Sequence, residues 1–245
     1  MRPKPDMQTA IAKAIDLLED EQEPYALLWL DVIYRRFGIT EFANSLQRYD
    51  QILTEQPEQG HIMRVFRRIA DYYNEVQIKD LEAVSLPSDL IIAHALYCDR
   101  LGLPSDYPQM LDRAASQGGY YLTHVLLAWI WVQENGCELA LPDGFIDEVY
   151  HANAAIINSD PMTVDDLKLE AAAFLYLAGQ GGLVDDSFVE RVIVRQNDDG
   201  SWGRSSDDQE AAYWHWHSTI VGLLLLLHVE FPADSYPPVL DSASP

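Results

Sequence analysis

The chain has 245 residues with 16 basic and 39 acidic side chains, which gives a formal net charge of −23 at pH 7. Such a charge repels nucleic acid and anionic lipid surfaces at long range, so neither is expected as a partner. With 48% apolar residues the chain can bury a large core, which argues against a disordered protein.

The cellular compartment is indicated by the amino-terminal segment, the longest apolar run and the cysteines. Residues 1–7 lack the apolar stretch of a signal peptide. The run Thr219–Leu227 is too short to cross a bilayer. Cys98 and Cys137 can form at most one bridge, and we expect both to be free thiols. These features predict a cytoplasmic protein without a membrane span.

Apolar residues recur at helical spacing along nearly the whole chain, and the alternation typical of strands is almost absent. Gly and Pro residues divide the chain into about eleven helices. Helices that are apolar on all sides are expected, in chain order, at Tyr25–Phe37, Leu90–Leu101, Tyr120–Val132, Leu167–Ala178 and Tyr213–Leu227. Amphipathic helices are expected between them at Glu41–Leu53, Tyr107–Ala115, Gly144–Ile157 and Ser187–Val194.

This alternation predicts the architecture. A helix that is apolar on all sides must be enclosed by others, so the pattern indicates helical hairpins with an inner and an outer layer. A closed α/α toroid and an open helical solenoid both fit. We favour the toroid because the inner helices are too apolar to face water. The expected fold is therefore all-α, a single α/α-toroid domain over residues 1–245 with a complete or incomplete ring, and a flexible C-terminal tail at 230–245.

Residues 191–203 resemble the repeated glutamine-to-tryptophan motif of triterpene cyclases, with Gln196, Gly200 and Trp202 at the matching positions. The resemblance implies the α/α toroid of terpenoid cyclases and protein prenyltransferases, in which this glutamine and tryptophan tie an outer helix to the next inner helix. The aspartate-rich acid motif of class II terpene cyclases, Asp-x-Asp-Asp, does not occur in this chain. The resemblance therefore implies the fold more than the activity.

The stretch that follows, residues 213–224, is similar to an inner helix of protein prenyltransferase β subunits. His217 matches a histidine that binds zinc in that family. Neither Cys98 nor Cys137 has an aspartate two residues earlier, so the complete prenyltransferase zinc site is absent.

Four of the enclosed helices carry one ionisable residue near the N-terminal end in apolar surroundings: His94, His124, Glu170 and His217. If the inner helices run parallel, these residues lie at similar height around one central cavity. Burying them is costly unless they are hydrogen-bonded or bind an ion. Helix dipoles are expected to keep the imidazoles neutral. We predict a zinc or non-haem iron site with the three histidines as ligands and Glu170 as fourth ligand or general base.

Aromatic residues follow or precede these four positions on the same helices: Tyr97, Trp131, Phe174, Tyr213 and Trp214. Side chains at helical spacing share a face, so we expect these residues to line a hydrophobic cavity that binds the substrate. The sequence thus favours a metal-dependent enzyme acting on a hydrophobic small molecule or peptide.

Two alternatives stay open. A buried histidine often bonds only a backbone carbonyl, which favours a non-catalytic binding or scaffold protein of the same fold. A metal-free protein that binds or converts isoprenoids is the third candidate, because Tyr97, Trp131 and Trp214 are suited to stabilising cations.

Overall fold

The structure is a computed structural model that describes residues 6–56, 60–160, 162–203 and 215–242. Within these ranges the chain forms thirteen α-helices and no strand, which confirms the predicted all-α class. None of the described helices combines the length and the apolarity needed to cross a membrane.

The larger helices follow the predicted pattern. The α-helices are α1 Met7–Leu18, α2 Pro24–Phe37, α3 Ser45–Glu55, α4 Gly60–Phe66, α5 Ile78–Glu82, α6 Pro87–Leu96, α7 Cys98–Leu101, α8 Tyr107–Gln117, α9 Tyr120–Glu134, α10 Phe145–Asn158, α11 Asp166–Leu177, α12 Asp186–Arg195 and α14 His215–Glu230. Short 3-10 helices are η1 Thr40–Phe42, η3 Arg67–Ile69 and η4 Gly181–Leu183. The single helix expected at Leu90–Leu101 is divided, because the backbone leaves helical geometry at Tyr97.

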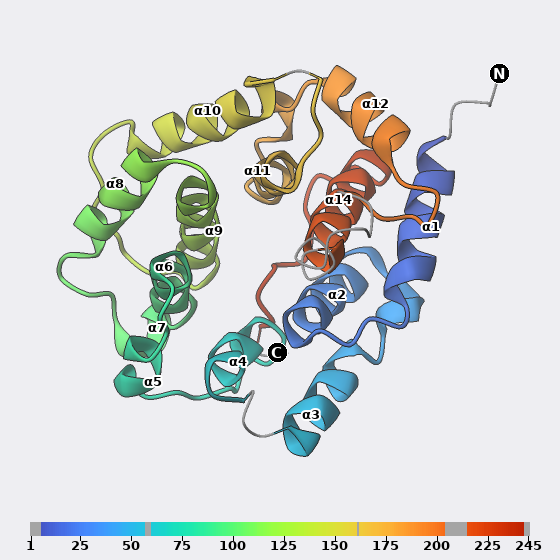
Figure 1. The fold of residues 1–245 in the computed structure, drawn as a ribbon. Helices are drawn as coiled ribbons and strands as arrows, with labels where there is room; N and C mark the ends of the chain where they lie inside the picture. Colours follow the sequence, from blue (N-terminus) through green and yellow to red (C-terminus); the bar gives the residue numbers. More distant parts are fainter. Residues whose placement is uncertain (1–5, 57–59, 161, 204–214, 243–245) are drawn as a thin grey trace.

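Six helices contact one another in a cycle that runs α2, α4, α6, α9, α11, α14 and back to α2. Figure 1 shows these helices nearer the centre, with α1, α3, α8, α10 and α12 around them. The outer helices pack against inner partners: α3 on α2, α8 on α9, α10 on α11 and α1 on α14. The helices expected to be enclosed are those of the cycle, apart from α4. These enclosed helices bury apolar side chains on all sides. In α14, for example, five consecutive leucines, residues 223–227, are all buried.

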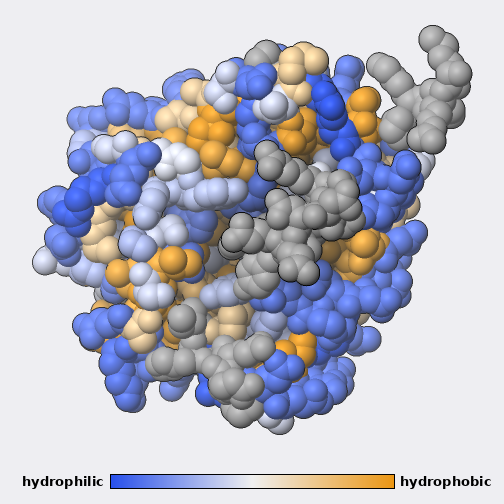
Figure 2. Space-filling view, viewed as in Figure 1, coloured by the Kyte–Doolittle hydropathy of each residue, from blue (hydrophilic) through white to orange (hydrophobic). Residues whose placement is uncertain are grey.

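The surface is mostly hydrophilic on the face that Figure 2 shows. On the face shown in Figure 2, hydrophilic residues cover the periphery and hydrophobic residues surface in separate patches between them. The core is one continuous cluster of apolar side chains to which most of the helices contribute.

The turn after α12 joins three helices. The Gln196 amide donates to the backbone carbonyl of Ala10 in α1 at 2.8 Å. The Trp202 indole donates to the carbonyl of Val192 in α12 at 2.7 Å. Its ring lies against Gly222 of α14, where an added Cβ would come within 2.8 Å of the ring. Residues 196–202 therefore fix α12 relative to both α1 and α14.

The two cysteines form a disulfide, with their Cα atoms 6.2 Å apart, so the expectation of free thiols was wrong. Cys98 begins α7 directly after α6, and Cys137 follows the end of α9. Because α6 and α9 pack side by side, both cysteines arrive at the same end of the helix pair. The expected cytoplasmic location loses the support of reduced cysteines and stays a prediction.

The described part of the expected flexible tail that follows α14, residues 231–242, makes specific contacts with the rest of the chain. Val239 and Leu240 are 0% and 4% exposed, and their backbone N–H groups donate to the carboxylate of Glu134 at 2.8 and 2.9 Å. The N–H of Asp241 donates to the carbonyl of Ile69 at 2.9 Å. A segment without helical periodicity looks unstructured from sequence, yet long-range contacts hold this one in place.

Candidate functional site

Three side chains at the N-terminal ends of α11 and α14 form a compact group. Asp165 caps α11 by accepting from the N–H of Lys168 at 3.0 Å, which places Asp166 in the first turn. Glu170 follows four residues later on the same face. His217 lies in the first turn of α14, which packs against α11.

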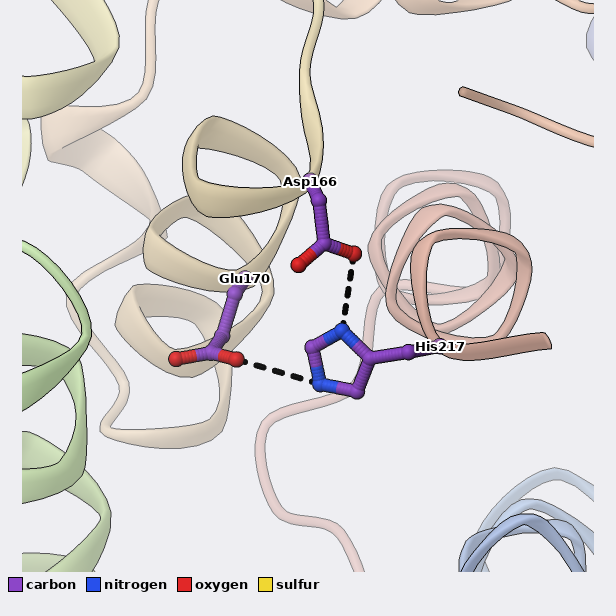
Figure 3. A group of neighbouring side chains, drawn as sticks. All are labelled: Asp166, Glu170 and His217. Carbon is purple, nitrogen blue, oxygen red and sulfur yellow. Dashed lines mark hydrogen bonds and ion pairs between the residues drawn. The ribbon is translucent and has the colours of Figure 1, made fainter. Parts of the chain in front are cut away.

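The atoms of this group that could bind a metal ion lie close together. One oxygen each of Asp166 and Glu170 and a ring nitrogen of His217 all lie within 4.8 Å of one another. Figure 3 shows His217 pointing between the two carboxylates. Among the described residues this is the one such group of three or more histidine, cysteine or acidic side chains.

His217 is held between the two carboxylates. Its Nδ1 lies 2.7 Å from Oδ1 of Asp166, and its Nε2 lies 3.1 Å from Oε2 of Glu170. Both nitrogens can donate only when the ring is an imidazolium. Burial alone would lower the pKa of His217, but the hydrogen bonds to Asp166 and Glu170 outweigh it and raise the pKa to about 10. The expectation of a neutral imidazole was therefore wrong here, because two full charges exceed the partial charge of a helix end.

Glu170 is 1% exposed, and its carboxylate contacts side chains of two other helices, α9 and α14. The Thr123 hydroxyl of α9 donates to Oε1, and Nδ1 of His124 lies 3.6 Å from the same oxygen. Lys168, which precedes Glu170 on α11, bonds Thr163 Oγ1 at 2.8 Å and the carbonyl of Asp160 instead. The carboxylate of Glu170 therefore contacts Thr123, His124 and His217.

His124 connects the group to α6. Its Nδ1 lies 2.7 Å from the carbonyl of Tyr120 and donates to it, so Nε2 carries the lone pair in the neutral ring. This Nε2 lies 3.8 Å from Oδ1 of Asp89, in the first turn of α6. Burial raises the pKa of Asp89, and the nearby His124 opposes that shift. The structure brings His124, Glu170 and His217 together, and their chemical roles stay predictions.

His94 does not belong to the group, in contrast to the expectation. Its ring lies 6.2 Å from that of Tyr107 on α8, and burial lowers its pKa. Residues five apart on a helix point in directions that differ by about 140°. Because Asp89 of α6 faces His124, His94 is directed elsewhere.

The sequence pattern did not point to Asp89, Asp166 or Tyr120. Both aspartates stand at helix starts, where acidic residues are common as caps and dipole partners, so they drew no attention. The Tyr120 hydroxyl donates to Oδ2 of Asp166 at 2.6 Å, and the tyrosine is 45% exposed. Burial raises the pKa of the Tyr120 hydroxyl, and the adjacent Asp166 adds to the shift. The position of Asp166 four residues before Glu170 was the signal available in the sequence.

Three of the five residues expected to bind substrate are described, and all three are buried. The Tyr97 hydroxyl donates to the carbonyl of Val65 at 2.6 Å. Phe174 stacks on Trp29 with ring centroids 6.0 Å apart, and Trp131 lies in the core. The other two, Tyr213 and Trp214, lie outside the described residues.

Comparisons with known proteins add no relative. No family model, no curated protein and no solved structure matches the chain. The resemblance to terpenoid cyclases and prenyltransferases stays a prediction from the motif.

The charges and donor atoms of the group fit a metal ion. Three carboxyl groups lie at the N-terminal ends of α6 and α11: Glu170 is buried, Asp89 and Asp166 are half-buried, and hydrogen bonds to two of them raise the pKa of His217. Excess negative charge away from water favours a bound cation. Carboxylate oxygen together with imidazole nitrogen is a donor set for zinc or iron. An ion on His217 must displace a proton, so metal and proton compete for this ring.

Proposed function

We propose that Asp166, Glu170 and His217 hold a zinc or iron ion and that the protein is a metal-dependent enzyme acting on a hydrophobic small molecule or peptide. The observation that carries this proposal is the position of their potential ligand atoms within 4.8 Å of one another on two packed helices. A carboxylate that is 1% exposed and bordered by two histidines supports it.

The surrounding residues have separable roles in this proposal. Thr123 orients Glu170, and Tyr120 orients Asp166, through the hydrogen bonds that each hydroxyl donates. His124, with its Nε2 toward Asp89, is placed to exchange a proton with a bound substrate. A zinc or iron ion would supply Lewis-acid activation of water or a carbonyl, or oxidative chemistry in the case of iron.

We also propose that the helices form the α/α toroid that the sequence pattern favours. The cycle of contacts among the six inner helices supports this fold, as do the outer helices packed around them. The bonds from Gln196 and Trp202 support it further, because they join α12 to its neighbours on both sides.

Metal analysis tests the proposed site. We expect protein purified without an affinity tag to carry about one zinc or iron ion per chain, and metal-stripped protein to rebind it. Glu170→Gln and His217→Ala should each weaken zinc binding at least about tenfold. His151→Ala, an exposed histidine of α10, is the matched control and should change nothing. If the unaltered protein neither contains nor binds a transition metal, the proposal fails.

One observation favours a second candidate, a non-catalytic protein in which the group only joins helices. Both nitrogens of His217 already have carboxylate partners, so the ring can act as a clamp between α14 and α11. Under this alternative His217→Ala lowers the melting temperature, while zinc has no effect on the melting temperature of the unaltered protein. Stabilisation by zinc that disappears in Glu170→Gln supports the metal site instead.

A further inference from the structure

The C-terminal segment, defined here as residues 236–241, is held at the C-terminal ends of the inner helices by side chains that bind its backbone. Glu134, the last residue of α9, accepts the N–H groups of Val239 and Leu240 at 2.8 and 2.9 Å. The candidate metal site lies at the N-terminal ends of α11 and α14, so the two features occupy different ends of the inner helices.

Three arginines bind the carbonyl groups of the same segment. Arg35 donates to Val239 at 2.9 Å, Arg68 donates to Asp241 at 3.2 Å, and Arg36 donates to Pro237. These arginines come from the end of α2 and from η3. Together with Glu134 they form a set of charged side chains, which we call the groove, that bind main-chain atoms, and main-chain atoms are common to every peptide.

Side chains of the segment add selectivity. Tyr236 lies under the guanidinium of Arg36 at 4.5 Å and against the ring of His228 at 4.9 Å. Val239 and Leu240 enter the core. Two prolines, Pro237 and Pro238, stand between Tyr236 and Val239. They favour an extended backbone before binding, which reduces the entropy lost on binding. The groove therefore suits an extended peptide with an aromatic residue, two prolines and two aliphatic residues.

Arg35 and Arg68 have carboxylate partners outside the segment, Asp31 at 2.7 Å and Asp99 at 3.6 Å, and the segment adds the bonds to its own backbone. Arg68 is buried, and burial raises the pKa of Glu134. Buried charges of this kind are costly when they lack partners. The connection from α14, residues 231–235, is exposed throughout. Contacts of the segment itself, more than those of its connection, therefore hold it in the groove.

We propose that the groove formed by Arg35, Arg36, Arg68 and Glu134 is a peptide-binding site that the chain's own C-terminal segment occupies, and that the same peptide binds there when it is supplied on a separate molecule. This site is independent of the proposed metal centre.

The test uses the full chain with a protease site inserted between Asp234 and Ser235 in the exposed connection, cleaved after folding. The probe is a fluorescent peptide of residues 235–245, and its anisotropy is measured with cleaved and uncleaved protein. The matched control peptide carries Val239→Asp and Leu240→Asp. Circular dichroism and gel filtration follow the helix content and size of the cleaved protein.

We expect the fluorescent peptide to replace the cleaved fragment at one copy per chain, with helix content unchanged. The uncleaved protein should bind it at least about 100-fold more weakly, because the connected segment competes at high effective concentration. The control peptide should bind at least about tenfold more weakly, because it cannot bury two aliphatic side chains. The proposal is overturned if the probe does not bind the cleaved protein, if both peptides bind equally, or if release of the fragment unfolds the helices.

Discussion

Nδ1 of His217 lies 2.7 Å from Oδ1 of Asp166, and this contact joins the first turn of α14 to the first turn of α11. The other ring nitrogen points to Glu170. In the metal-free protein a proton therefore occupies the nitrogen that a metal ion would use, and the two states of the ring differ in charge and in their dependence on pH.

The pKa of His217 predicts a loss of stability at alkaline pH in the metal-free protein. It is about 10 in the folded chain against 6.5 for the unperturbed group. A raised pKa contributes stability fully below pH 6.5, and the contribution disappears as the pH rises through 10. We expect the unfolding free energy of the unaltered protein to exceed that of His217→Gln by a few kcal/mol below this window.

Urea denaturation of both proteins in the presence of a chelator, at pH values across this window, measures the difference. The difference should shrink steadily toward the alkaline end. A difference that does not depend on pH would show that His217 is not held as an imidazolium.

His228 predicts the opposite pH dependence at the other end of α14. Its Nδ1 donates to the carbonyl of Leu224 at 2.7 Å, and its Nε2 accepts from Arg36 at 3.1 Å, an arrangement open only to the neutral ring. Burial and then Arg36 lower the pKa of His228 to about 4, although the Leu224 carbonyl opposes them. The contribution of His228 to the unfolding free energy is therefore complete above pH 6.5 and is lost as the pH falls through 4.

Over this acidic range the unaltered protein should lose roughly 3 kcal/mol more unfolding free energy than His228→Gln. Chemical denaturation at the two ends of the range provides the comparison. Equal losses in the two proteins would mean that His228 is not kept neutral by the fold.

Gly222 predicts a steric effect at the Trp202 ring. An alanine Cβ at this position would lie 2.8 Å from the ring, which is itself buried between α12 and α14. Gly222→Ala should lower the unfolding free energy by about 1–3 kcal/mol through overpacking. Gly182→Ala is the control, because an added Cβ there meets no atom within 4 Å. Thermal unfolding of both variants decides the point, and equal melting temperatures would count against the packing described.

The disulfide predicts sensitivity to reducing agents. Cys98 and Cys137 are 39 residues apart in the sequence, and a closed loop of this length stabilises a fold by about 4 kcal/mol in the chain-entropy account. Protein treated with a reducing agent should melt at a lower temperature than untreated protein. A double variant with alanine at both positions should match the reduced protein and be insensitive to the agent. Equal melting of the oxidised and reduced forms would contradict a stabilising bridge.

Sequence periodicity was sufficient for the helical class and for the enclosed helices, because an apolar pattern on all sides has few structural explanations. An isolated ionisable residue in an apolar helix also drew attention to His124 and Glu170, and the resemblance to prenyltransferase β subunits drew attention to His217; the structure brings these three side chains together, and their roles stay predictions. Asp89 and Asp166 were missed because an acidic residue at a helix start has an ordinary explanation as a cap or dipole partner.

The disulfide and the bound C-terminal segment depend on which helix ends meet in space. Cys98 lies next to Cys137, and Glu134 next to Val239, because α6, α9 and α14 pack together. No local sequence pattern predicts these contacts. His94 was wrongly included for a related reason. Its apolar surroundings were visible in the sequence, whereas the face of α6 that turns toward α9 was not.

The most direct test of the metal site is anomalous X-ray diffraction at the zinc edge from crystals of zinc-loaded protein. We predict one strong peak at about 2.0–2.2 Å from a ring nitrogen of His217 and from oxygens of Asp166 and Glu170. A map without a peak among these three side chains, in which His217 still bonds both carboxylates at saturating zinc, would contradict the proposal.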